Sequence, residues 1–223
     1  MPGNTIRAVY VLVRKDLMLD YRSPIHATTQ AVFSIASGVL AGLVQRQSIW
    51  EPGALLPISL AIVLVFQGIF SSYISFVRER EYNTIDSLRL LPLPPEAVYT
   101  AKFLYTTMNI LAFTTIFIGS LAFFTGTWPG PALPLLVWIL AASILVGSVA
   151  SLASAMMIYT SSPSSLAPML IMTLTLPFFN VSSRALNTIS QGYVPQPGWE
   201  APLLGYSVGF LIVAALLSRY LLE

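Results

Sequence analysis

The sequence contains no cysteine, one histidine and two lysines among its 223 residues. Without cysteine, the chain has no means of forming disulfides, thiolate metal sites or thiol redox centres. It has no G-x-x-x-x-G-K-[ST] motif, and neither Lys15 nor Lys102 follows a glycine-rich loop. His26, the sole imidazole, is expected to be an interfacial polar residue, and a haem ligand is the alternative. Since no carboxylate clearly lies inside an apolar run, we expect no enzyme activity, no metal and no cofactor in this chain.

Charged residues are also scarce. They make up 9% of the chain, whereas hydrophobic residues make up 56%, and the mean hydropathy is +0.76. A soluble domain carries about 25% charged residues, so composition indicates an integral membrane protein. A helix of roughly 20 apolar residues crosses the hydrocarbon core, and the length therefore allows about six spans. We expect an all-α membrane protein with a single transmembrane domain over residues 1–223.

Six apolar runs could form these spans. We place them at Ala27–Val44, Leu55–Val77, Phe103–Thr125, Leu133–Tyr159, Leu166–Phe179 and Ala201–Leu222. The first run begins behind several charges and lacks a clear small-residue cleavage site, so we interpret it as a retained span and not as a signal peptide.

Lysine and arginine predict the orientation, because cations that flank a span resist translocation. With the N-terminus inside, only Arg46 and Arg184 lie outside. The cytoplasmic side then holds Arg7, Arg14, Lys15, Arg22, Arg78, Arg80, Arg89, Lys102 and Arg219. This predicts a multi-pass protein of the cytoplasmic (inner) membrane with both termini in the cytoplasm. The net charge of +2 reflects topology and does not indicate nucleic-acid binding.

Residues 5–22 precede the first span and carry an amphipathic pattern. Apolar side chains recur at helical spacing, and the cations lie elsewhere around the helix. The apolar residues are Ile6, Val9, Tyr10, Val13, Leu17 and Tyr21. This predicts an interfacial helix against membrane lipid. Its role is either that of a topogenic flank or that of an elbow that grips a partner.

The polar segment 78–102 separates the second and third apolar runs. Asn83 or Thr84 can cap a short helix, and Pro92 can end it. Its apolar stripe, flanked by charges of both signs, fits a groove on a cytoplasmic partner, and the alternative is an ordinary surface loop. The residues expected to make this contact are Arg78, Glu79, Arg80, Glu81, Thr84, Ile85, Asp86, Leu88, Leu91 and Pro92.

Small residues recur every fourth position in several spans, which favours close helix packing. They are Ser34, Gly38, Gly42, Ser143, Gly147, Ser151, Gly205 and Gly209. We expect them to pack within one chain, with a dimer interface as the alternative. Gln67 and Asn109 lie inside spans, where we expect interhelical hydrogen bonds.

The fifth apolar run contains Pro168 and Pro177, each of which removes an intrahelical hydrogen bond. The stretch that follows, 181–200, carries Gly192, Pro195 and Pro197. We expect it to form an outer-face loop, either plain or folded back into the interface as a re-entrant helix.

The segment from Phe76 to Lys102 also carries a resemblance. Its central pieces are Arg78-Glu79, Thr84-Ile85-Asp86-Ser87-Leu88 and Leu90-Leu91-Pro92-Leu93-Pro94. They resemble the cytochrome c maturation protein B family, also called haem exporter protein B, within the ABC-2 type transporter permeases. The resemblance extends more weakly over the whole chain, through its length, its six-span layout and the run LAPMLIMTLTLPFF.

The resemblance implies a permease that pairs with a second copy of itself and with two ATP-hydrolysing subunits. It also implies other cytochrome c maturation membrane proteins, which present haem to a chaperone. In such permeases the segment between spans two and three is the coupling helix, here Thr84 to Leu91. Haem is then a handled substrate, and ATP is bound by the partner. The resemblance leaves open whether ATP drives haem export or the release of the loaded chaperone.

Two other functions remain open. One is an ABC-2 exporter of a different amphiphile, such as a lipid or a drug. The other is a passive scaffold that assembles membrane proteins without ATP coupling.

Overall fold

The computed structural model describes residues 2–22, 24–47, 55–74, 94–157 and 163–222. Within these ranges the chain is helical, with short connections. The helices are α1 (Pro2–Arg22), α2 (Ile25–Gln47), α3 (Leu56–Ser72), α6 (Pro95–Thr125), α7 (Ala132–Met157), α8 (Pro163–Ser190) and α9 (Glu200–Leu222).

Five of these helices are long and apolar enough to cross a membrane, namely α2, α6, α7, the Leu166–Ser190 part of α8, and the Glu200–Ser218 part of α9. The multi-pass class is therefore confirmed. A count of six spans is not: the second predicted span, Leu55–Val77, corresponds to α3, which has 17 residues and is shorter than a typical span. The predicted end of that span at Val77 lies outside the described residues.

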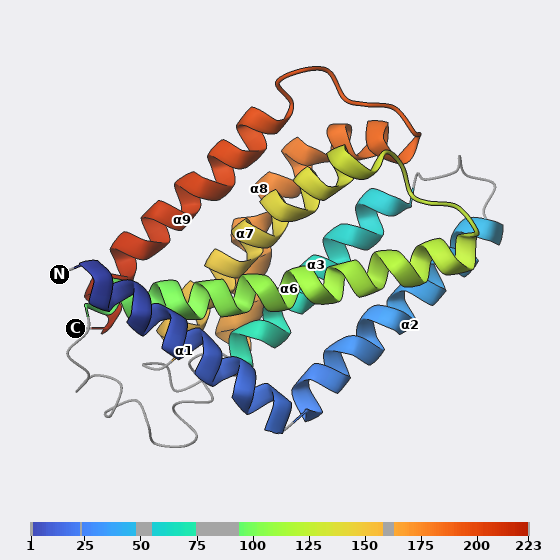
Figure 1. Cartoon of the computed structure of the whole chain (residues 1–223). Coiled ribbons are helices and arrows are strands. Elements are labelled where there is room, and N and C mark those ends of the chain that lie inside the picture. The colour runs from blue at the N-terminus through green and yellow to red at the C-terminus, as the bar shows by residue number, and fades with distance from the viewer. Residues whose placement is uncertain (1, 23, 48–54, 75–93, 158–162, 223) are drawn as a thin grey trace.

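The spanning helices run back and forth between two ends of one bundle (Figure 1). We call the end that holds both termini and the start of α6 the proximal end. The distal end holds the connection 126–131 and the connection 191–199. Helix α1 lies across the proximal end and packs against α6. Arg46 near the end of α2 and Arg184 near the end of α8 are both distal, whereas Lys102 lies near the start of α6 at the proximal end. The orientation of the two ends in the membrane stays a prediction.

Helix α7 forms the centre of the bundle and packs against α3, α6, α8 and α9. In its membrane-length window 78% of the residues are buried, against 22–33% in the other candidate spans. Trp138, Leu145 and Val149 are fully buried there. The surrounding helices expose apolar side chains such as Leu40, Ile62 and Leu216, which suits contact with lipid.

Close helix approach occurs at three of the predicted small residues. A Cβ at Gly38 of α2 would overlap Ser120 Oγ and lie 2.8 Å from Phe117 O of α6. At Gly42, a Cβ would lie 2.9 Å from Phe124 Cβ. At Gly147 of α7, it would overlap the Thr107 side chain. Glycine at these positions allows α2 and α7 to pack closely against α6, because a larger side chain would force the helices apart.

Side-chain hydrogen bonds join the same helices. Gln67 Nε2 of α3 donates to Ser34 Oγ of α2 at 2.7 Å, which is the interhelical bond expected of Gln67. The hydroxyls of Thr106 and Ser151 lie 2.8 Å apart between α6 and α7. Ser143 is buried on α7, where its hydroxyl has no hydrogen-bond partner among the described residues. No interhelical bond from Asn109 is present within the described part of the chain.

The expected packing at Gly205 and Gly209 differs from the structure. Both glycines are exposed on α9, and a Cβ at either would have no other helix within 4 Å. Helix α9 instead meets α7 through Ser207, whose Oγ donates to Ala141 O at 2.9 Å. Gly205 and Gly209 lie on either side of Ser207 in the sequence but on an exposed face of α9. The spacing of small residues therefore did not identify the face of α9 that packs against α7.

The boundary predicted after the fifth span needs correction. Helix α8 continues to Ser190, so the connection covers residues 191–199 and not 181–200. Ser182, Leu186 and Ile189 are buried at helical spacing, which anchors this polar-looking turn to the bundle. Gly192, at φ 87°, then ends the helix and donates its N–H to Ile189 O at 3.0 Å.

Candidate functional sites at the two ends of the bundle

A buried ion pair joins α1 to α6 at the proximal end. Lys102 Nζ of α6 lies 2.9 Å from Asp16 Oδ2 of α1. Both side chains are at least 95% buried. Removing either partner of such a pair is strongly destabilising, because the remaining charge is then buried and unpaired. The pair therefore fixes the position of α1 on α6.

A second polar contact between α1 and α6 lies one helical turn after the ion pair. Tyr105 of α6 donates a hydrogen bond to the Asp20 carboxylate of α1. Lys15 Nζ lies 3.6 Å from Asp16 Oδ1 at the more exposed edge. Asp16 and Asp20 are four residues apart and so lie on one face of α1, matching Lys102 and Tyr105 on α6. We call these four residues the α1–α6 clamp.

The length of α6 predicts that the clamp lies at the edge of the membrane core. Helix α6 has 31 residues, which is about 46 Å, longer than a hydrocarbon core of about 30 Å. Lys102 is about 35 Å from Thr125 along the helix by its rise per residue. If Thr125 marks the distal edge, Lys102 reaches the proximal interface. The first turns of α6, from Pro95 on, then extend beyond the hydrocarbon.

The predicted coupling residues, Arg78 to Pro92, lie outside the described residues. The structure resumes at Pro94, whose backbone is extended (φ −65°, ψ 142°) and which precedes the first turn of α6. Glu96 lies in that turn, where a carboxylate suits the positive end of the helix dipole. Lys102, the last residue of the predicted segment 78–102, therefore lies about two turns into α6. Residues 95–102 belong to this helix, which begins earlier than the span predicted from Phe103.

Helix α1 presents two further faces. Ile6, Tyr10, Leu17 and Tyr21 of the predicted apolar stripe are exposed, while Val9 and Val13 are partly buried. The exposed stripe is available to lipid, and its interfacial location stays a prediction. Another face carries a hollow of about 480 Å³ lined by Val11, Arg14, Lys15, Met18, Leu19 and Arg22.

Sequence reasoning missed the clamp. The partners are 86 residues apart, and only the crossing of α1 over α6 brings them together. Two signals were present nonetheless. Lys102 directly precedes an apolar run, and Asp16 with Asp20 recur at helical spacing in a segment that otherwise carries cations.

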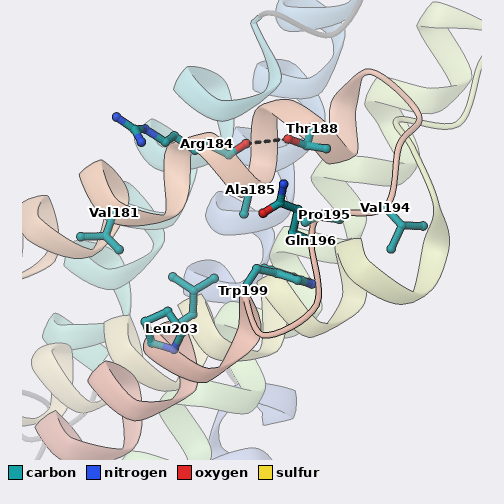
Figure 2. Close-up of a pocket in the computed structure, with 10 residues that line it drawn as sticks. Val181, Arg184, Ala185, Thr188, Val194, Pro195, Gln196, Trp199 and Leu203 are labelled. Carbon is teal, nitrogen blue, oxygen red and sulfur yellow. Dashed lines mark hydrogen bonds between the residues drawn. The ribbon is translucent and has the colours of Figure 1, made fainter.

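A cavity of about 500 Å³ opens at the distal end, between the last turns of α8, the connection 191–199 and the first turn of α9. Figure 2 shows its walls: Ala185 and Thr188 come from α8, and Trp199 and Leu203 face them from the other side. The lining residues are Val181, Arg184, Ala185, Thr188, Val194, Pro195, Gln196, Trp199, Pro202 and Leu203. We call it the distal cavity.

One charged side chain, Arg184, is among the described residues that line the cavity. Arg184 lines the cavity on the α8 side, and its guanidinium extends away from Trp199 (Figure 2). Glu200 follows Trp199 in the first turn of α9, and its Oε2 is buried without a hydrogen-bond partner among the described residues. No group of three or more His, Asp or Glu side chains able to hold a metal occurs in the described ranges.

The comparison with protein families gives a match over most of the chain. Residues 7–191 match the model of the ABC-2 type transporter, a stretch that begins in α1 and ends after α8. A search of the curated proteins finds no match. Permeases of this family work with an ABC ATPase partner. Since the match covers well over half of the sequence and the helices are those of a multi-pass membrane protein, the chain belongs to the ABC-2 type transporter permease family.

Proposed function

We propose that this chain is the permease subunit of an ABC transporter that acts in cytochrome c maturation. It couples ATP hydrolysis in a partner subunit to haem export or to release of the haem-loaded chaperone. The observation that carries the coupling role is the buried Asp16–Lys102 pair, which ties α1 to α6, the described helix that follows the predicted coupling helix Thr84 to Leu91. The haem assignment rests on the resemblance of Phe76 to Lys102.

The clamp gives a physical route for the coupling. A push on the segment before Pro94 acts first on the initial turns of α6. Because Lys102 and Tyr105 hold α1 by two polar contacts, α1 and α6 move as one body. Thr106–Ser151 and the close approach at Gly147 pass the displacement to the central helix α7. Motion at the proximal end thereby reaches the middle of the bundle.

The proposed assembly contains two copies of this chain and two ATPase subunits, with other cytochrome c maturation membrane proteins that handle haem. ATP is bound in the ATPase subunits, and this chain carries no cofactor of its own. The hollow along α1, with Arg14, Lys15 and Arg22, offers a basic surface for lipid headgroups or for an acidic face of a partner.

The test is Leu88→Asp in the predicted coupling segment. The proposal expects loss of ATPase copurification or of stimulated hydrolysis, because a buried apolar anchor becomes an unpaired charge. Leu133→Asp is the control, since Leu133 is exposed at the distal end, far from the proposed contact. If Leu88→Asp keeps both the complex and the stimulation, the coupling role fails and a passive scaffold is the better account.

The haem assignment is tested separately. Complexes purified in mild detergent should contain haem-handling membrane proteins, identified by mass spectrometry, and an absorbance scan should locate any haem. Haem that travels with this subunit alone supports direct export, and an ATPase without haem supports mechanical release of the chaperone. A complex with an ATPase but with no haem-handling protein supports an exporter of another amphiphile.

A further inference from the structure

We propose that the distal cavity binds one amphiphile with an anionic headgroup. The headgroup lies at Arg184, and the apolar chain lies against Trp199 and Leu203. This site is independent of ATPase docking, because it lies at the opposite end of the bundle from α1 and the start of α6 (Figure 1).

The size and lining of the cavity fit such a ligand. Its volume of about 500 Å³ falls within the range of small-molecule sites, which is about 300–1,000 Å³. Most lining side chains are apolar, and the polar groups are few: Arg184, Thr188 and Gln196. Mostly apolar walls with a small number of polar groups are typical of a ligand site, where the polar groups fix the orientation.

The walls of the cavity are held in place by local structure. Thr188 Oγ1 donates to Arg184 O at 3.1 Å, so the hydroxyl is engaged within α8 (Figure 2). The backbone N–H of Trp199 donates to the backbone carbonyl of Gln196 at 3.3 Å, within a turn that includes Gly198 at φ 90°. This turn places the indole of Trp199 opposite Ala185. The ring therefore provides a flat apolar surface for a chain.

Charge determines the headgroup and its direction. Arg184 is the one charged side chain among the described residues that line the cavity. A guanidinium binds carboxylate or phosphate by paired, charge-assisted hydrogen bonds. Because the Arg184 guanidinium extends away from Trp199, the headgroup lies at the α8 edge of the cavity. The chain can then leave past Val181 and Leu203, towards the exposed apolar surfaces of α8 and α9.

The same chemistry could come from a phospholipid or from a single-chain acid. Both probes are tested in phosphatidylcholine vesicles, with Trp199 fluorescence as the readout. Trp50 and Trp128 are replaced by Phe, and Trp138 is kept as a constant background because it is buried in the core. The quenchers are dibromostearate, brominated phosphatidylglycerol and, as the neutral reference, brominated phosphatidylcholine at equal bromine content.

The proposal expects Trp199 quenching that saturates at a low mole fraction of an anionic probe, beyond the quenching by brominated phosphatidylcholine. Arg184→Gln should raise the half-saturating mole fraction about tenfold, as expected for loss of a charge-assisted hydrogen bond. Ala185→Phe should abolish saturation by filling the cavity while leaving the charge. Arg46→Gln, at the other distal cation, should leave the curve unchanged.

A chain that carries Trp128 in place of Trp199 as the reporter provides a second reference. Trp128 is exposed in the connection 126–131 and is not among the residues that line the cavity. It should report the unsaturable quenching of the bulk interface. Saturation by either anionic probe supports the site and identifies its source. Equal quenching by all three probes, or equal effects of Arg184→Gln and Arg46→Gln, overturns it.

Discussion

Lys102 and Asp16 form a 2.9 Å ion pair between α6 and α1, in a place where both side chains are nearly excluded from solvent. Two charges in such an environment cannot be separated without a large cost in free energy. The pair therefore specifies one arrangement of the N-terminal helix on the bundle. It also makes α1 part of the folded permease and not merely a flank of its first span.

The first prediction concerns this pair. Asp16→Leu should lower the free energy of unfolding by about 3–5 kcal/mol, because it leaves the Lys102 ammonium buried and unpaired. Lys102→Met should cost less, since Lys15 Nζ at 3.6 Å still compensates Asp16 in part. Unfolding in mixed micelles measures both changes.

The double variant Asp16→Leu/Lys102→Met completes the cycle. Replacing both charges with apolar side chains should recover most of the lost stability. A double variant as unstable as the sum of the single variants would show that the two residues do not interact.

The second prediction concerns the close approach of α2 and α6. Gly38→Leu should lower stability by about 1–3 kcal/mol, because the added side chain overlaps Ser120 and Phe117 O. Gly209→Leu is the matched control, since nothing on another helix lies within 4 Å of a Cβ there. Thermal unfolding of the purified variants compares them, and equal losses would contradict the packing at Gly38.

The third prediction concerns the bond between Gln67 and Ser34. Gln67→Leu should lower the free energy of unfolding by about 0.6–2 kcal/mol, the usual range for one interhelical hydrogen bond in a membrane protein. Ser34→Ala in the Gln67→Leu background should add little, since the bond is already absent. Additive losses would indicate that the two side chains act independently.

Much of the fold could be predicted from apolar run lengths. The predicted spans at Ala27–Val44, Leu133–Tyr159 and Ala201–Leu222 lie close to α2, α7 and α9. The C-terminal end of α6 at Thr125 also matches its prediction. These boundaries could be predicted from the sequence because a glycine, a proline or a charged residue interrupts each apolar run.

The remaining features depend on tertiary contacts. Residues 181–190 are rich in serine, asparagine and threonine, so hydropathy predicted a loop, yet Leu186 and Ile189 anchor them as helix. The Asp16–Lys102 pair and the distal cavity each require the relative positions of two helices. Short-range spacing carries no information about such positions.

The most direct measurement of the central claim uses the natural absence of cysteine. Leu88→Cys introduces a single thiol into the predicted coupling segment, and a membrane-impermeant maleimide labels it in sealed vesicles of known orientation. The account predicts labelling from the cytoplasmic side alone, and protection of the thiol when the ATPase subunit is bound. Labelling from the opposite side, or cytoplasmic labelling that the ATPase does not slow, would contradict it.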